Sequence, residues 1–201
     1  MSHETLLNTI QHEEEIKRSR FIAIAAPCPN ETAVQSFLAQ HHVSEANHNC
    51  YAWRIGQTYR FNDDGEPSGT AGKPILQAID GQGLDQVAVV VIRYFGGIKL
   101  GAGGLIRAYG GSAARCLQSG ERKVLIEYAE FELSVPFEHL GTLHHALPSF
   151  QAEIIKEHYE DQGLRAKIKL PKAEFEGMQR QLKDASGGVL KITPAEVSQP
   201  G

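Results

Sequence analysis

The segment RYFGGIKLGAGGLIRAYGG, residues 93–111, decides the fold of this chain, and it directly follows the apolar run VAVVVI at residues 87–92. A run of β-branched residues that ends in a glycine turn is typical of a strand buried on both faces. After Gly104, small and apolar residues recur at helical spacing as far as Leu117. The segment therefore predicts a strand, a glycine turn and a helix in succession.

The glycines of this segment have two interpretations, and both stay open. Those at the turn let a backbone or a ligand approach closely, and the free N–H groups of a helix start suit an anion such as phosphate; they are Gly96, Gly97, Gly101, Gly103 and Gly104. Close packing of the helix on the sheet explains glycines equally well, including Gly110 and Gly111 inside the helix. The chain completes neither a G-x-G-x-x-G motif nor a P-loop, which argues against nucleotide hydrolysis.

Charge is distributed unevenly along the chain. The net charge of −4 argues against a protein that binds nucleic acid over its whole surface. However, residues 86–120 contain no acid, and a local basic patch can attract a polyanion even on an acidic protein. We predict phosphate contacts from four cations, with Tyr94 or Tyr109 stacking on a base, although an aromatic residue beside a buried strand is more often part of the core. The four cations are Lys73, Arg93, Lys99 and Arg107.

A second unusual segment is the loop NDDGEPSGTAGKP, residues 62–74, which has almost no apolar side chain. Ordered loops of this length inside a domain tend to be functional. Asp63, Asp64 and Glu66 could bind magnesium, contact a partner or act as general bases. Alternatively, they only supply turn chemistry. The spacing leaves these alternatives open and identifies no catalytic residue, so enzymatic activity stays undecided, with a preference for none.

Cysteine and histidine usage indicates no metal site and no cofactor. Three cysteines with no C-x-x-C pair are typical of reduced core thiols in a cytoplasmic protein. The nine histidines are scattered without the spacing of a metal motif. We also expect no signal peptide and no membrane-spanning helix, because the longest apolar run is far shorter than the ~20 residues that a bilayer requires.

The order of expected elements indicates an α+β protein of two domains, residues 1–125 and 128–201. In the first, a polar N-terminal arm precedes a strand at 20–26, a helix capped by Asn30, and a hairpin at 48–61. In the second, the patterns follow the order β-α-β-β-α-β, which is the ferredoxin-like plan.

The segments 63–74 and 93–111, taken together, resemble the IMPACT family, in particular its bacterial, YigZ-like branch. The resemblance implies an N-terminal fold like the second domain of ribosomal protein S-five, a β/α sandwich with helices on one sheet face. It also implies a ferredoxin-like C-terminal domain similar to the last domain of the translocating elongation factor G. Eukaryotic relatives regulate translation through an additional N-terminal domain, so their specific partner is not transferred to this chain.

Three hypotheses about function follow. The first is a cytoplasmic translation regulator that binds RNA, the ribosome or a translation-associated protein through the glycine-rich basic segment. The second is a magnesium-dependent enzyme that acts on a phosphorylated small molecule. The third is a protein-interaction module that acts through the C-terminal sheet. None of them involves a membrane.

Overall fold

The structure is a computed structural model that describes residues 3–195. It divides into two compact units, of which the first ends at Leu125 and the second starts at Ile126. Helices and antiparallel sheets occur in both, as expected for an α+β protein. None of the helices within residues 3–195 has the length and apolarity that crossing a bilayer requires.

The N-terminal unit is built on a five-stranded antiparallel sheet with the order β2-β3-β6-β4-β5. A separate pair of short strands, β1 and β7, forms a second, two-stranded sheet. The elements of this unit are β1 (His3–Leu6), β2 (Ile10–Ile16), β3 (Ser19–Pro27), α1 (Glu31–His41), β4 (His48–Ile55), β5 (Thr58–Asn62), α2 (Gly72–Gly81), β6 (Val87–Tyr94), α3 (Ala102–Gln118) and β7 (Arg122–Leu125).

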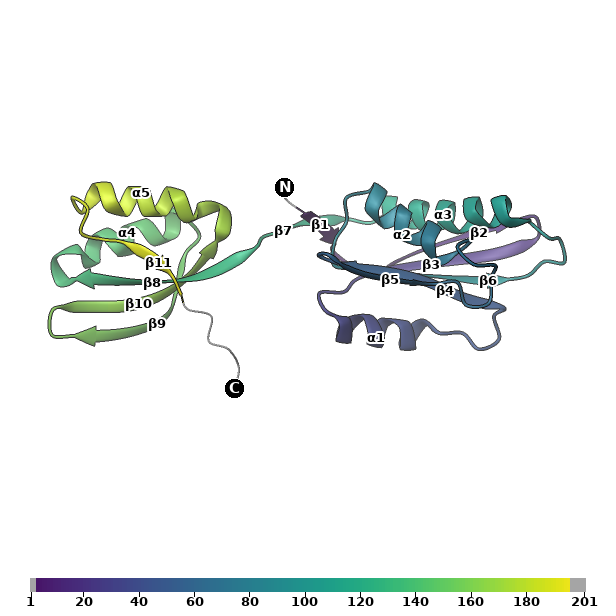
Figure 1. The fold of residues 1–201 in the computed structure, drawn as a ribbon, viewed down its shortest axis with the longest axis horizontal. Helices are drawn as coiled ribbons and strands as arrows, with labels where there is room; N and C mark the ends of the chain where they lie inside the picture. Colours follow the sequence, from purple (N-terminus) through teal and green to yellow (C-terminus); the bar gives the residue numbers. More distant parts are fainter. Residues whose placement is uncertain (1–2, 196–201) are drawn as a thin grey trace. The chain divides into compact units, whose positions relative to one another are not determined.

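Helices cover both faces of the five-stranded sheet (Figure 1). On one face, α2 and α3 pack on alternate residues of the strands, such as Val89 and Val91 of β6. On the other face, Phe37 of α1 packs with Trp53 and Val90. The expectation of helices on one face only is therefore wrong. Helices cover both faces because both sets of alternating residues in β6 are apolar, so each face of the sheet must be shielded from water.

Residues 87–118 form the predicted strand, turn and helix. Strand β6 is buried from Val87 to Arg93, and it is the central strand of the sheet. Helix α3 starts after Gly101, which has a φ of 72°, a value that glycine adopts without steric strain. The loop between them, residues 95–101, is called the glycine turn below.

The expected polar N-terminal arm is wrong, because these residues form β1 and β2. In β2, burial alternates along the strand, but two of the inward-facing residues are His12 and Glu14. Polar residues on the inner face conceal the alternation that identifies a half-buried strand. The following turn, Lys17–Arg18, has positive φ at both positions without a glycine or asparagine. It therefore lacks the usual signature of a hairpin.

The C-terminal unit has the element order β-α-β-β-α-β that the sequence pattern predicts. Its antiparallel sheet has the strand order β11-β8-β10-β9, and α4 and α5 cover one face (Figure 1). The elements are β8 (Tyr128–Pro136), the 3-10 turn η1 (Phe137–His139), α4 (Leu140–Ser149), β9 (Glu153–Glu160), β10 (Gly163–Pro171), the 3-10 turn η2 (Lys172–Glu174), α5 (Phe175–Ala185) and β11 (Ile192–Pro194).

Candidate functional site

Four segments that are distant in sequence meet where β6 ends in the N-terminal unit. The glycine turn lies so close to the β2–β3 turn that a Cβ placed on Gly96 would be 1.9 Å from the carbonyl oxygen of Arg18. The amide of Phe95 donates to the Asn47 side chain over 2.8 Å, which ties the turn to the segment before β4. Residues 62–74, the acidic loop, join the same place through Glu66, as described next. These four segments form the candidate site.

Glu66 is the buried centre of the candidate site. Its side chain is 4% exposed, and its Oε1 accepts hydrogen bonds from Arg93 over 2.5 Å and from the Tyr109 hydroxyl over 2.8 Å. The Nε2 of His48 lies 3.7 Å from the same oxygen. A single carboxylate thus connects the acidic loop to β6, α3 and β4. Because a buried carboxylate needs such partners to be stable, this cluster fixes the loop against the sheet.

Arg93 also supports an aromatic residue on the surface. Its guanidinium carbon lies 5.5 Å from the ring centre of Phe21 in the core and 5.5 Å from that of Phe95. Its Nη2 donates to the hydroxyl of Ser19 over 3.3 Å, and that hydroxyl also accepts from the Gly96 amide. Within residues 3–195, the buried Nε of Arg93 has no hydrogen-bond partner. The result is a stack of Phe21, Arg93 and Phe95, with Phe95 at its exposed end.

The two aspartates of the acidic loop organise the loop itself. Both oxygens of Asp63 accept backbone N–H groups, from Gly69 on one side and from Ala71 and Gly72 on the other, at 2.8–3.0 Å. Asp64 accepts the Asn49 amide over 2.5 Å. Residues 3–195 contain no cluster of three or more side chains arranged to hold a metal ion. The carboxylates therefore serve as acceptors for the loop and for neighbouring backbone amides.

The cations predicted to contact phosphate lie in different environments. Arg93 is buried and paired with Glu66, so its charge lies inside the site and not at its surface. By contrast, Lys99, Arg107 and Lys73 are exposed, and none of them has an ion-pair partner within the described residues. Lys73 precedes Pro74, which packs beside Gly110 of α3. Contact of these side chains with phosphate stays a prediction.

Two further cations belong to this surface, and the sequence reasoning missed them. Lys17 and Arg18 are exposed in the β2–β3 turn, and neither makes an ion pair within residues 3–195. The backbone contact between Arg18 and Gly96 places them beside the glycine turn. Only the recognition of β2 as a strand could have revealed them, because the pairing of β2 with β3 brings this turn to the end of β6.

The glycines of the segment divide between the two interpretations left open by the sequence. Gly96 is required for packing, since a side chain there would collide with the β2–β3 turn. Gly97 and Gly101 have φ values of 83° and 72°, and each faces open space. Gly103 is also exposed, whereas Gly104 is half-buried with Leu100 at 3.0 Å from its virtual Cβ. The exposed glycines leave backbone accessible between Phe95 and the start of α3.

The two tyrosines proposed to stack on bases differ in their exposure. Tyr109 is fully buried, and its pKa is raised by burial and by the neighbouring Cys50 and Glu66. Tyr94 is half-buried, with the guanidinium of Arg20 5.6 Å from its ring centre. Phe95, which the sequence analysis did not select, is 46% exposed. Exposed stacking at this site is therefore possible for Phe95 and not for Tyr109.

The three cysteines are free and buried, as predicted. Burial raises the pKa of the Cys50 thiol to about 12, and that of Cys28 to about 11. Burial likewise raises the pKa of Cys116 to about 12. Because the thiolate is the nucleophilic form, none of these thiols is suited to nucleophilic catalysis near neutral pH.

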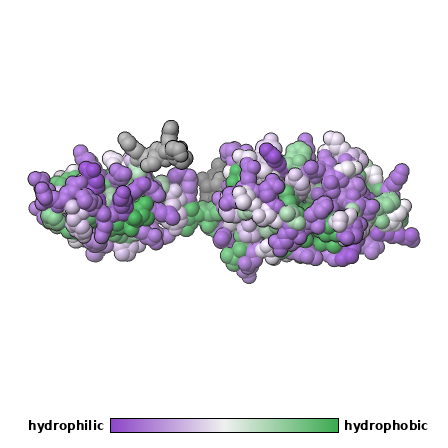
Figure 2. Space-filling model, turned by 90° about the horizontal axis from the view of Figure 1, so that it is seen from below, coloured by the Kyte–Doolittle hydropathy of each residue, from purple (hydrophilic) through white to green (hydrophobic). Residues whose placement is uncertain are grey.

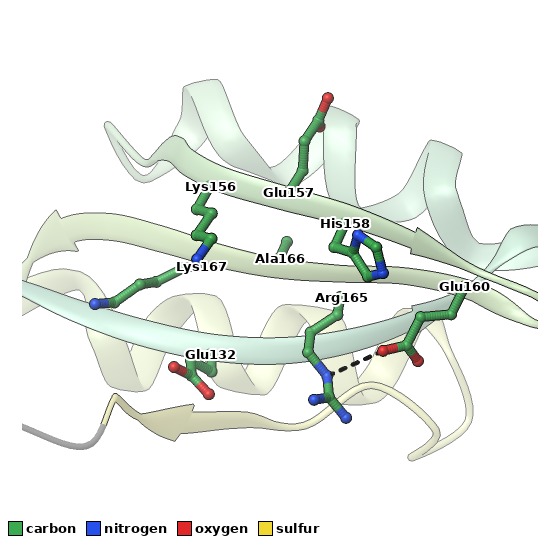
Figure 3. A pocket seen from close by; sticks show the side chains of 8 residues that line it. All are labelled: Glu132, Lys156, Glu157, His158, Glu160, Arg165, Ala166 and Lys167. Carbon is green, nitrogen blue, oxygen red and sulfur yellow. Dashed lines mark ion pairs between the residues drawn. The ribbon is translucent and has the colours of Figure 1, made fainter. Parts of the chain in front are cut away.

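The C-terminal unit contains a pocket of about 560 Å³ on the sheet face opposite its helices (Figure 3). The side chains of Lys156, His158 and Arg165 gather there, while Glu157 points away. The eight lining residues include three cations and three carboxylates, of which Glu157 points away from the pocket. Two of the cations are paired, Arg165 with Glu160 over 3.5 Å and Lys167 with Glu130 over 2.5 Å. This pocket therefore presents one cation, Lys156, without an ion-pair partner within residues 3–195, fewer than the surface around the glycine turn.

The face of the N-terminal unit that α1 covers shows no large apolar patch among the described residues. Figure 2, which views the N-terminal unit from the side that α1 covers, is mostly hydrophilic with small, scattered hydrophobic areas. Single exposed apolar residues of this kind are normal in folded proteins. On the N-terminal unit, the cations around the glycine turn are the feature that most needs a functional explanation.

Comparison with known proteins identifies the family. Residues 17–117 match the model of the Impact N-terminal domain. An IMPACT family member encoded in a pol 5' region of Thermus thermophilus is 49% identical over 78% of this chain and 86% of its own length. The family member YigZ of Escherichia coli (strain K12) is 36% identical over 91% of this chain and 93% of its own. A crystal structure described as a hypothetical protein covers 97% of this chain and 98% of its own, with 34% identity and a TM-score of 0.69. The chain belongs to the IMPACT family.

Proposed function

We propose that this protein regulates translation by binding RNA, free or within the ribosome, through the surface around the glycine turn. The observation that carries the proposal is a group of five exposed cations on the β2–β3 turn, the glycine turn, α2 and α3 that make no ion pair within residues 3–195, on a protein whose net charge is −4. They are Lys17, Arg18, Lys73, Lys99 and Arg107. Cations without carboxylate partners are free to neutralise phosphates and to release the counterions bound to them.

The chemistry of the surface favours RNA over a small phosphorylated substrate. A magnesium-dependent enzyme needs carboxylates directed at an open site. Here, Asp63 and Asp64 accept backbone amides, and Glu66 is buried against Arg93. The free cations belong to separate segments, the β2–β3 turn, the glycine turn, α2 and α3. Such a spread fits a ligand with several phosphates, as in an RNA strand.

The fold supports the same proposal by analogy. The C-terminal unit has the strand order β11-β8-β10-β9 in a β-α-β-β-α-β chain, which is the arrangement of a ferredoxin-like domain. We propose that it corresponds to the last domain of elongation factor G, and that the N-terminal unit corresponds to the second domain of ribosomal protein S-five. Fold analogy alone does not assign function, so the binding experiment decides.

The test is RNA binding by the wild type and by the double variant Lys99→Ala/Arg107→Ala, measured by fluorescence anisotropy over a range of salt concentrations. We expect affinity to fall steeply with salt. The logarithmic salt slope should become shallower in the variant, by roughly 0.7 for each phosphate contact removed from a single strand. Absence of salt-dependent binding to RNA and to ribosomes would refute the proposal.

The matched control is the double variant Lys156→Ala/Arg165→Ala, which also removes one lysine and one arginine, but from the pocket of the C-terminal unit. If the control retains wild-type affinity, the loss in the first variant is specific to the glycine turn. If instead only the control loses affinity, the RNA-binding surface lies on the C-terminal sheet and our assignment of the site is wrong. A partner protein that binds this sheet in the absence of RNA would support the alternative of a protein-interaction module.

A further inference from the structure

We infer that the site takes single-stranded RNA with at least one unpaired base, and that Phe95 is the residue on which this base stacks. The inference rests on the proposed function, because it specifies which form of RNA the same surface recognises. It comes from the stack of Phe21, Arg93 and Phe95, which the proposed phosphate contacts do not use.

The stack holds Phe95 rigidly at the surface. One side of its ring lies against the guanidinium of Arg93, 5.5 Å from the ring centre, and the side chain is nevertheless 46% exposed. The guanidinium is held in turn by Glu66 and by the Phe21 ring beneath it. The Phe95 backbone is fixed as well, because its amide donates to Asn47. An aromatic ring that is supported from below loses little conformational entropy when a base covers its free side.

The surroundings of Phe95 combine free cations with exposed apolar residues, since Ile98 is 40% exposed and Ile106 is 42% exposed, and the cations favour a nucleotide over a purely apolar partner. Gly96 and Gly97 follow directly, so no side chain from these positions covers the ring. Lys99 is four residues further along the glycine turn, and Arg18 lies against Gly96. An aromatic ring among free cations matches a base attached to phosphates, since the ring receives the base and the cations receive the backbone.

This arrangement favours unpaired bases. In an A-form duplex, the faces of the bases are hidden in the stack, and proteins contact mainly the phosphates and the 2′-hydroxyl groups. A single protruding ring such as Phe95 reaches a base face only where the strand is single or looped. The free cations alone would bind single and double strands with much less discrimination.

The experiment compares three probes with the full chain: a 12-nucleotide single-stranded RNA, the same strand annealed to its complement, and the same strand with abasic positions in place of its bases. We expect the single strand to bind most tightly. The variant Phe95→Ala should lose roughly fivefold to a hundredfold in affinity for the single strand and little for the abasic strand. Phe61→Ala is the matched control, because Phe61 is a similarly exposed phenylalanine of the same unit, on β5.

A second variant, Phe95→Trp, gives a direct readout of stacking. The added indole should be quenched by the single strand and much less by the abasic strand, while Trp53, the natural tryptophan, is buried and serves as an internal reference. Equal affinity for the single and abasic strands, or an effect of Phe95→Ala no larger than that of Phe61→Ala, would overturn the inference and leave the proposed function standing. If none of the three probes binds and ribosomes do not bind either, the proposed function fails as well.

Discussion

Removal of the Glu66 side chain tests whether one buried carboxylate holds the candidate site together. In the variant Glu66→Ala, Arg93 keeps its charge in a position where its side chain is only 6% exposed. Breaking a buried ion pair from one side costs about 3–5 kcal/mol, because it leaves an uncompensated buried charge. The Tyr109 hydroxyl also loses its acceptor, and an unsatisfied buried group adds about 1–3 kcal/mol where the site does not relax or admit water. We therefore expect the free energy of unfolding of the N-terminal unit to fall by at least about 3 kcal/mol.

The chain offers a specific assay for this unit. Trp53 is the only tryptophan, and it is buried between the sheet and α1. Its fluorescence during urea denaturation therefore reports the unfolding of the N-terminal unit, while circular dichroism reports both units. The control is Glu13→Ala, which breaks the exposed pair with Arg20 and should leave the denaturation midpoint nearly unchanged.

A double variant separates the buried charge from the lost contacts. Glu66→Ala combined with Arg93→Met removes both charges, so the pair of substitutions should cost less than the sum of the two single ones. The reasoning is refuted if Glu66→Ala shifts the midpoint no more than Glu13→Ala does. It is also refuted if the single variants add without coupling, since neither would then depend on the other.

Three further predictions concern other parts of the N-terminal unit. Gly96→Ala should lower the free energy of unfolding by about 1–3 kcal/mol, because the added Cβ would collide with the Arg18 backbone. Gly81 faces open space, so Gly81→Ala should not cause this loss, and equal urea midpoints for the two variants would contradict the prediction. Burial alone would raise the pKa of Glu14, but hydrogen bonds from Arg115 and Ser112 outweigh burial and lower that pKa. The stability that Glu14 contributes is therefore present above about pH 4.5 and is lost as the pH falls. The variant Glu14→Gln should therefore lose less stability than the wild type between pH 5 and about pH 3. Identical losses would contradict a lowered pKa of Glu14. The thiols of Cys28, Cys50 and Cys116 are buried and their pKa values are raised, so they should react with iodoacetamide at pH 8 only after denaturation. Rapid alkylation of the folded protein would contradict the burial of these thiols.

The parts of the fold that were predictable from the sequence are those in which local pattern and burial agree. Strand β6 is apolar at every position from Val87 to Ile92, and α3 repeats small and apolar residues at helical spacing, so both could be identified. Asn30 caps α1 through a bond from the Ala33 amide, as its position before the helix indicated. The β-α-β-β-α-β order of the C-terminal unit followed from the same kind of alternation.

The parts that were not predictable depend on contacts between distant segments. Glu66 resembled any loop carboxylate, and only the folded chain places it against Arg93, Tyr109 and His48. For the same reason, Arg93 was taken for a surface cation. Strand β2 escaped notice because Glu14 faces inward, where it pairs with Arg115 of α3. In each case, a charged residue pairs with a partner more than 25 positions away, which no local pattern records.

Hydrogen–deuterium exchange of the full chain, with and without the 12-nucleotide single-stranded RNA, tests the central claim most directly. It locates the binding surface without altering any residue, and the exposed amides of the glycine turn exchange rapidly unless a ligand covers them. We predict slower exchange in residues 94–107 and 15–20 when RNA is present, with residues 153–170 unchanged. Protection confined to residues 153–170, or no protection at RNA concentrations that saturate binding, would contradict the account.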